Sequence, residues 1–166
     1  MAEFDWSRFA LKIYIDAPMQ LVYDAWTTRT NLEGWFLRKA EFTMPNGLVR
    51  DYNSQVQKDD TYSWLWHGHP DTTAESGTVT EANGKDRFQF IFGKAGLVTV
   101  QLKQFEDVTE MILTQEQIPT DESGKSNYHV GCSTGWTFYF ANLKSILEGG
   151  HDLRNKNPAY KNVVNS

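Results

Sequence analysis

Five residues near the C-terminal end of the chain match a motif of hydrolytic enzymes. The pentapeptide GCSTG at 131–135 has the G-x-S-x-G spacing of the nucleophile elbow, in which a sharp turn exposes a serine hydroxyl. The elbow needs a strand before it, a helix after it, and an acid and a histidine later in the chain. Only His151 and Asp152 follow, in the wrong order and with no later strand to position them. We therefore predict that these glycines and Ser133 serve close helix packing rather than catalysis.

Two groups of residues carry side chains of the kind that bind metals. His67, His69 and Asp71 are close in sequence, and His129 and Cys132 are spaced i, i+3, so they share one face if the segment is helical. A zinc site needs three or four converging ligands, and neither group has a recognised ligand spacing. The sequence therefore predicts no metal site and calls for no cofactor.

Large apolar side chains alternate with period two along three neighbouring predicted strands, so each strand presents one apolar face. These faces are Tyr62, Trp64 and Trp66; Phe88, Phe90 and Phe92; and Val98, Val100 and Leu102. Trp136, Phe140 and Leu143 recur at steps of three and four, which predicts a helical stripe opposite them. A packed core explains any single one of these residues, but together the rings suit a roomy apolar cavity as well.

We predict that such a cavity would bind a small hydrophobic molecule through residues of these faces. The predicted ligand-binding residues are Trp35, Tyr62, Trp64, Trp66, His67, Phe90, Phe92, Val98, Val100, Trp136, Phe140 and Leu143. Among them His67 alone titrates near neutral pH and could act as a general acid or base, but the sequence shows no partner to position it. No catalytic residue is predicted. Other polar residues that could face the cavity are Gln89, Thr99, Gln101, Thr114 and Glu116.

The elements that must position these residues follow from the same periodicities. Period two predicts strands over 9–15, 38–43, 61–67, 75–81, 86–92, 96–105 and 109–118, separated by turn-forming residues such as Asn83-Gly84. The polar stretch 48–60 holds either one more short strand or a loop. Asp16 is expected to cap a first short helix, and Thr30 with Glu33 to form the capping box of a second. Ser126 or Asn127 is expected to cap a long helix that ends at Glu148.

This order of elements predicts an α+β fold. Consecutive strands form a curved antiparallel sheet of about six to seven strands, wrapped round the long C-terminal helix, with two short helices after the first strand. We expect one domain over 1–166, with its core at about 9–148 and a loosely held polar tail at 149–166. Curvature leaves space between sheet and helix, which is where small ligands bind.

The composition of the chain limits its binding partners and its cellular location. The net charge of −5 and the absence of basic runs argue against nucleic acid and anionic membrane as partners. No apolar run is long enough to span a membrane, and the first residues do not resemble a secretory signal. Cys132 is the single cysteine, so no internal disulfide can form and a cytoplasmic location is expected.

Several short segments carry a resemblance to a known family: 15–18 together with Val22 and Trp26, 32–36, 64–68 (WLWHG), 135–136 and 143–148. With them the chain resembles the helix-grip fold of the START-like superfamily, also called SRPBCC or Bet v I-like. Within that superfamily it is most similar to the activators of heat-shock protein 90 ATPase and their homologues. The resemblance covers nearly the whole chain, but its motifs are short and apolar, so it implies the fold more strongly than any activity.

The resemblance leaves three functions open. Many bacterial members look like binders of small ligands, which agrees with the favoured prediction of a small hydrophobic ligand. Eukaryotic co-chaperones of the family usually carry an additional N-terminal domain that contacts the chaperone, whereas this chain begins directly with its first predicted strand. A chaperone contact is therefore the alternative, and a cyclase- or hydrolase-like enzyme using the same cavity is a further one. The oligomeric state is not predicted.

Overall fold

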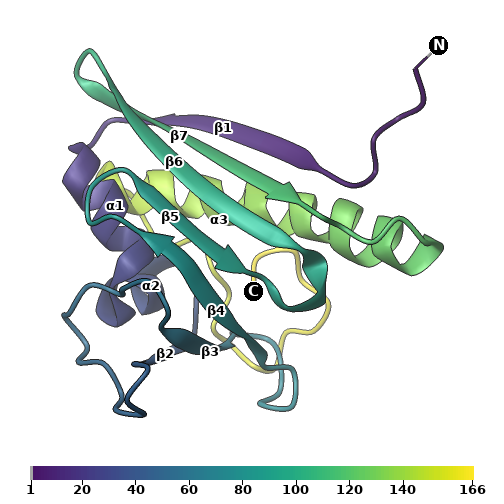
Figure 1. The fold of residues 1–166 in the computed structure, drawn as a ribbon, viewed down its shortest axis with the longest axis horizontal. Coiled ribbons are helices and arrows are strands. Elements are labelled where there is room, and N and C mark those ends of the chain that lie inside the picture. The colour runs from purple at the N-terminus through teal and green to yellow at the C-terminus, as the bar shows by residue number, and fades with distance from the viewer. Residues whose placement is uncertain (1) are drawn as a thin grey trace.

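The computed structural model describes residues 2–166. An antiparallel sheet of seven strands, in the order β1-β7-β6-β5-β4-β3-β2, curves round one long helix (Figure 1). The strands are β1 Phe9–Ile15, β2 Lys39–Thr43, β3 Thr61–Leu65, β4 Glu75–Ala82, β5 Arg87–Ile91, β6 Leu97–Phe105 and β7 Val108–Glu116. The helices are α1 Met19–Thr27, α2 Arg29–Trp35 and α3 Gly131–Leu147, with a 3-10 turn η1 Gly93–Ala95 and a π-helical segment η2 Gly124–Val130. The predicted α+β architecture is confirmed.

The strands form because apolar and polar residues alternate along them. On β6, Val98, Val100 and Leu102 are buried against the core, and the residues between them face outward. All seven predicted strands are present, with ends shifted by no more than two residues. The ambiguous stretch 48–60 is a loop with a single bridge between Thr43 and Val49.

The two short helices begin at other residues than the sequence predicts. Asp16 does not cap α1; Pro18 holds the N-cap position, and it supplies no side-chain hydrogen bond. The predicted capping box of α2 is also wrong, because Thr28 is the N-cap and its hydroxyl accepts a hydrogen bond from the backbone N–H of Asn31. Glu33 instead accepts a hydrogen bond from a backbone N–H of β2, so a tertiary contact replaces the local one.

The long helix also begins earlier than predicted. Helical backbone starts at residue 122, runs through η2 and continues without a break into α3. Asp121 acts as the cap, since its carboxylate accepts the backbone N–H of Gly124 at 2.7 Å. Ser126 and Asn127 lie inside the π-helical turns and cap nothing. The predicted end of the helix before Gly149 is confirmed.

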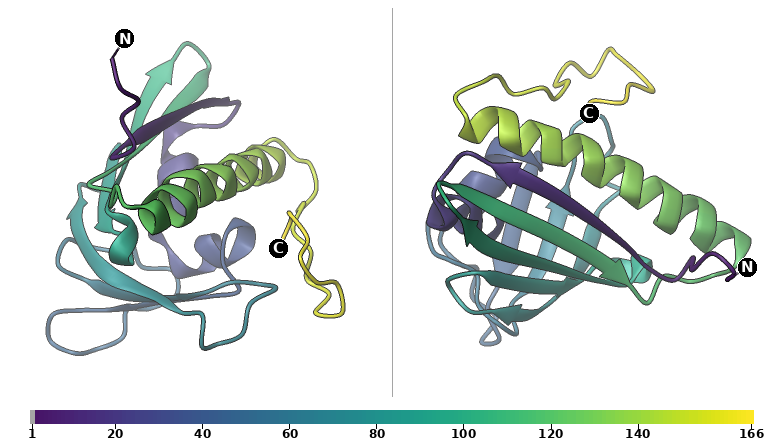
Figure 2. Two further views of the ribbon diagram at one scale, coloured as in Figure 1. Left: turned by 90° about the vertical axis from the view of Figure 1, so that its right-hand side faces the viewer. Right: turned by 90° about the horizontal axis from the view of Figure 1, so that it is seen from above.

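Helix α3 lies in the hollow of the curved sheet, as the end-on view in Figure 2 shows. Its buried face holds Trp136, Tyr139, Phe140, Asn142 and Leu143. The middle of the hollow is filled by closely packed rings rather than by space. Trp26 of α1 lies 4.8 Å from Trp35 and 5.6 Å from Trp136 between ring centroids, and all three rings are buried.

The C-terminal tail is held more firmly than predicted. It runs back along the side of α3 that faces away from the sheet (Figure 2). Arg154 is only 6% exposed and donates hydrogen bonds to the carbonyl oxygens of Leu37 and Glu33, each at 3.0 Å. The hydroxyl of Tyr139 donates to the carbonyl oxygen of Ser166 at 2.7 Å. The prediction of a loosely held tail is wrong, because a polar segment can be anchored by buried hydrogen bonds instead of apolar burial.

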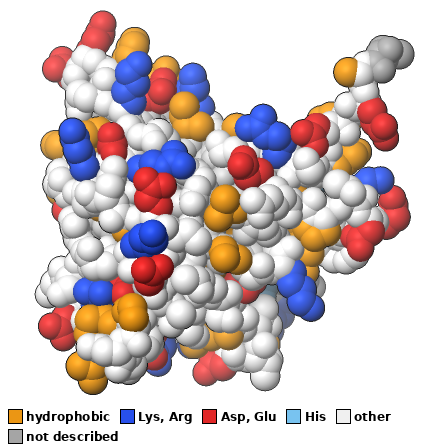
Figure 3. Space-filling view, viewed as in Figure 1, with side chains coloured by type: hydrophobic (Ala, Val, Ile, Leu, Met, Phe, Trp, Pro, Cys, Tyr) orange, Lys and Arg blue, Asp and Glu red, His pale blue; other side chains and the backbone are white. Residues whose placement is uncertain are grey.

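The outer face of the sheet carries both signs of charge side by side (Figure 3). Arg87 pairs with Glu81 at 2.7 Å and Lys12 with Glu110 at 3.7 Å, so these basic side chains lie beside acidic ones on this face. Within residues 2–166, no helix is long and apolar enough to cross a membrane.

Candidate ligand cavity

A cavity of about 470 Å³ lies between the N-terminal half of α3, η2 and the adjoining end of the sheet. Six of its lining residues have aromatic rings: Phe36, Trp66, Phe92, Tyr128, Trp136 and Tyr139. Its polar lining residues include His69, Thr73, Glu75 and Asn127. The remaining wall is formed by Ala95, by Gly131, Cys132 and Gly135 of α3, and by Ser166 of the tail. A volume of this size and an apolar lining are typical of small-molecule sites.

The structure brings only some of the predicted binding residues to this cavity. Trp66, Phe92 and Trp136 line it. Trp35 and Leu143 line a second, smaller pocket of about 150 Å³ between α1, α2 and α3. Six further residues are buried behind these walls in the packed core: Tyr62, Trp64, Phe90, Val98, Val100 and Phe140.

The centre of the predicted cavity is closed by aromatic packing. Trp136 reaches from α3 to the sheet side, with ring centroids 5.1 Å from Phe36 and 5.6 Å from Phe92. Behind this layer Trp64 stacks on Tyr62 at 4.0 Å and meets Phe90 at 5.1 Å. Space for a ligand therefore remains at the N-terminal end of α3, where the residues that face the cavity include the small Gly131, Cys132 and Gly135.

Gln115 is a functional candidate that the sequence analysis missed. It is fully buried on β7, accepts the indole N–H of Trp136 at 2.9 Å, and donates to the carbonyl oxygen of Ala95 at 2.9 Å. It thereby fixes two walls of the cavity. Alternation with the buried residues Met111 and Leu113 would have identified it as inward-facing.

The other polar residues expected at the cavity lie elsewhere. Gln89 receives a hydrogen bond from Thr80 and donates one to Thr99, and Gln101 lies beside Arg87; these contacts form a ladder on the outer face of the sheet. The expectation was wrong because Gln89 alternates with buried phenylalanines on β5. Thr99 and Gln101 likewise alternate with the buried Val98 and Val100 on β6, so these side chains must face the opposite way. Thr114 and Glu116 alternate with Gln115 and share that outer face.

Glu75 is the second residue that the sequence analysis missed. It is the first residue of β4, pairs with Trp64 on β3, and lines the cavity. Paired residues on neighbouring strands point to the same face of a sheet, so Glu75 faces the concave side with Trp64. The alternation of Glu75 with the buried Val79 is the sequence signal that could have found it.

His67 lies outside the cavity lining and has no side-chain hydrogen bond within residues 2–166. Partial burial lowers its pKa, and the positive charges of Arg154, Lys156 and Arg38 lower it further. The imidazole is therefore neutral at neutral pH. Without a positioned partner it has no geometry for general acid–base catalysis.

The G-x-S-x-G motif does not form a nucleophile elbow. Residues 131–135 are the first turn of α3 and follow a helical segment, not a strand. The hydroxyl of Ser133 donates to the carbonyl oxygen of Val130 inside the same helix, at 3.1 Å. Burial raises the pKa of the neighbouring Cys132 thiol, which therefore stays protonated at neutral pH. In the described part of the chain, no three His, Cys, Asp or Glu side chains gather closely enough to hold a metal ion.

Comparison with solved structures finds the same fold in several proteins. The Aha1 dimer from Colwellia psychrerythraea matches with a TM-score of 0.67 at 17% identity, over 86% of this chain and 97% of that one. A protein from Staphylococcus saprophyticus matches with a TM-score of 0.68 at 17% identity, over 89% and 96% of the two chains. An HSP90 activator from Plasmodium falciparum matches with a TM-score of 0.62 at 17% identity, over 86% and 96%. At this identity the likeness shows the fold alone.

A comparison at the level of sequence families agrees with the fold. No curated protein matches the chain closely enough to suggest an activity. The model of one family, described as Activator of Hsp90 ATPase homolog 1-like protein, matches residues 16–148, which span α1 to the end of α3. That match covers most of the 166 residues and confirms the resemblance drawn from the sequence. The chain therefore belongs to the family of Activator of Hsp90 ATPase homolog 1-like proteins.

Proposed function

We propose that this protein binds a small hydrophobic molecule in the cavity between α3 and the sheet. The observation that carries the proposal is the ring-lined space of about 470 Å³, which lies next to a core that is otherwise closely packed. Apolar surface that stays exposed to water is costly, and a ligand that covers it gains the corresponding free energy. Because Cys132 has no second cysteine to pair with, we place this function in a reducing compartment such as the cytoplasm.

The proposal is tested by filling the cavity from the helix side. Cys132 lines the cavity from α3, so Cys132→Phe would place a ring in the space that a ligand needs. Thr134 lies two residues further along the same helix and is exposed, so Thr134→Phe is the matched control. The measurement is the fluorescence of N-phenyl-naphthylamine, a neutral probe that brightens in apolar sites, with folding of each variant checked by circular dichroism.

We expect saturable binding of the probe to the native protein and to Thr134→Phe. Cys132→Phe should bind at least about tenfold more weakly, a loss of about 1.4 kcal/mol. Equal binding by all three proteins, or no binding by any of them, would contradict the proposal.

A chaperone contact is the second candidate, and the family match is the observation that favours it. One solved structure of the same fold is named as an HSP90 activator, although its identity to this chain is 17%. The loop between β2 and β3 carries three exposed apolar side chains, Leu48, Val49 and Tyr52, which suit contact with another protein. Titration of this protein into an Hsp90 ATPase assay should then raise the turnover rate, and Leu48→Ser should reduce the effect. If the ATP turnover rate of Hsp90 does not change during the titration, the chaperone contact is wrong.

A further inference from the structure

One carboxylate occupies a position where the pattern of the sheet calls for an apolar side chain. The β4 residues that face the concave side of the sheet are Glu75, Gly77 and Val79, and Val79 is completely buried. Glu75 also lines the cavity, next to the rings of Trp66 and Phe92. A charged group at an inward position is expected to be paired, because removing it from water is costly.

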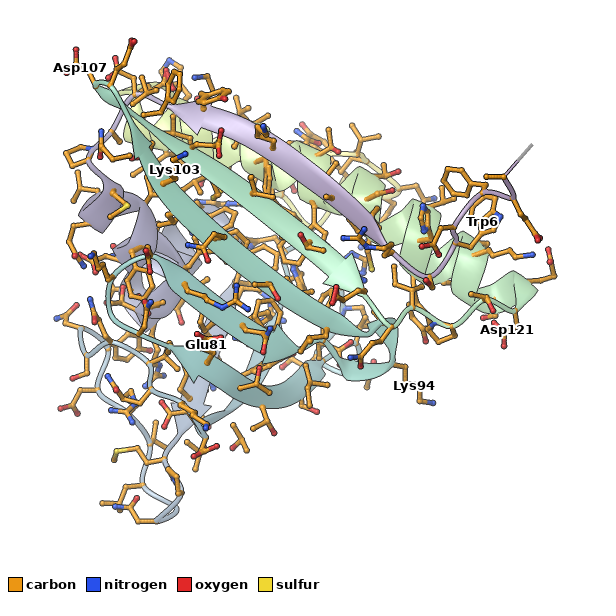
Figure 4. The ribbon with its side chains drawn as sticks, turned by 45° about the horizontal axis from the view of Figure 1, so that its top comes forward. Trp6, Glu81, Lys94, Lys103, Asp107 and Asp121 are labelled. Carbon is orange, nitrogen blue, oxygen red and sulfur yellow. The ribbon has the colours of Figure 1, made fainter. Side chains whose placement is uncertain are left out.

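Glu75 has no such partner. Among the ion pairs of residues 2–166, none involves Glu75, and its side chain accepts one hydrogen bond, from the backbone N–H of its neighbour Ser76 at 3.0 Å. The carboxylate packs over Gly93 of η1. Lys94 follows Gly93 directly, but its side chain points away from the molecule in Figure 4 and forms no ion pair with Glu75.

Three other cations near this end of the molecule form ion pairs with other carboxylates. Arg38 pairs with Asp71 at 2.5 Å, and both Arg154 and Lys156 pair with Asp152 at 2.8 Å. The lining of the cavity contains no lysine and no arginine. Among the described residues that line the cavity, Glu75 is therefore the one carboxylate side chain, and His69 is the one basic side chain.

The rest of the wall is suited to a cation. Aromatic faces attract ammonium groups through their quadrupole, with Trp the most effective, and this attraction grows when water is excluded. Trp66, Trp136, Phe92 and Tyr139 surround the cavity that Glu75 enters. The negative charge acts across this space: burial is the main reason that the pKa of Cys132 is raised, and the Glu75 carboxylate raises it further.

We propose that the ligand of this cavity is an organic cation: a ring-bearing apolar molecule with a protonated amine or a quaternary ammonium group. Glu75 supplies the counter-charge, and the aromatic wall receives both the apolar body and the ammonium group. This inference rests on the proposed function of hydrophobic binding and specifies its ligand class. An anionic ligand is disfavoured, because it would meet an unpaired carboxylate with no lysine or arginine among the described lining residues to offset it.

Three probes with one naphthyl body test the charge preference: naphthylmethylamine, naphthylmethanol and naphthoate, each titrated at pH 7 by isothermal calorimetry. The three differ in charge and little in size, so apolar burial is nearly constant between them. We expect the ammonium probe to bind about tenfold more tightly than the alcohol, and the carboxylate probe to bind most weakly.

Glu75→Gln removes the charge but keeps an oxygen that can accept the N–H of Ser76. It should lower the affinity for the ammonium probe about tenfold and leave the affinity for the alcohol unchanged. Glu116→Gln is the matched control, since it removes the same charge from the outer face of β7 and should change neither affinity.

The outcomes separate this inference from the function on which it rests. If all three probes bind with equal affinity and Glu75→Gln has no effect, the cation preference is wrong and the hydrophobic site stands. If the carboxylate probe binds best, the cation preference is likewise wrong. If no probe binds the native protein, both proposals fall.

Discussion

At the scale of single residues, the tail is held by one arginine and its carboxylate partner. Arg154 donates to two backbone carbonyl groups and to Asp152, and its side chain is 1% exposed. Burial by itself would raise the pKa of Asp152, but the hydrogen bonds from Arg154 and Lys156 outweigh it and hold that pKa well below its ordinary value of 3.8. The ionised carboxylate is thus part of what attaches the tail to the core.

This coupling predicts a pH dependence of stability. Because the folded-state pKa of Asp152 is depressed, its contribution is fully present above the unfolded pKa of 3.8 and is lost as pH falls toward the folded value. Urea unfolding at pH 7 should show Asp152→Asn less stable than the native protein by about 1–2 kcal/mol, and the difference should shrink by about 1 kcal/mol at pH 3. Asp107 lies at the tip of the β6–β7 hairpin and forms no ion pair within residues 2–166, so Asp107→Asn should show neither effect. Identical pH profiles for both variants would contradict this account.

At the scale of elements, the junction of β3, β4 and β5 requires a residue without a side chain, Gly77. Tyr62 pairs with Gly77, and its hydroxyl crosses over this glycine to donate to the carbonyl oxygen of Ile91 at 2.6 Å. A Cβ at position 77 would lie 2.7 Å from that hydroxyl and would collide with the Ile91 carbonyl oxygen itself. The glycine is required here for space rather than for an unusual backbone conformation.

Gly77→Ala is therefore expected to destabilise the protein by about 2–4 kcal/mol, because backbone must move or the buried hydrogen bond must break. The matched variant is Gly34→Ala in α2, where an added Cβ meets nothing within 4 Å. That change should be neutral or should stabilise by about 0.5–1 kcal/mol, because alanine favours the helix. Thermal and urea unfolding of both variants provide the measurement, and equal effects of the two changes would show that the contact at Gly77 is unimportant.

The strands and helices could be predicted from the sequence where the period of the apolar residues alone determines them. Alternation is a local property, so all seven strands and the end of α3 could be predicted from the sequence. The helix starts could not, because Glu33 and Asp16 have side chains that suit a cap, whereas tertiary contacts decide which residue caps. The period of the apolar residues also predicts which side chains face inward. It cannot distinguish the filled centre of the hollow around Trp26 from the open end of the hollow beside Cys132. That difference depends on how far rings from separate elements reach across the hollow.

At the scale of the whole molecule, the tail connects parts that are far apart in sequence. The backbone N–H of Leu153 donates to the side-chain oxygen of Asn142 on α3, and Arg154 binds carbonyl groups at and just after α2. Ser166 then reaches the loop after β3, where it lies against Gly68, and forms part of the cavity wall. The tail therefore covers α3 on the side opposite the sheet and borders the cavity as well (Figure 2).

A chain shortened after Gly150 tests this double role. The missing segment contains no helix or strand, so the shortened chain should fold with the same circular dichroism spectrum. Loss of the buried Arg154 contacts should lower its stability by about 2–4 kcal/mol. Because one wall of the cavity is removed with Ser166, the neutral fluorescent probe should bind several-fold more weakly and dissociate faster. The native chain and Asp152→Asn, in which the tail retains its other hydrogen bonds, give the reference values. Lower stability with unchanged probe binding would mean that the tail supports the fold alone, and that the cavity is complete between α3 and the sheet.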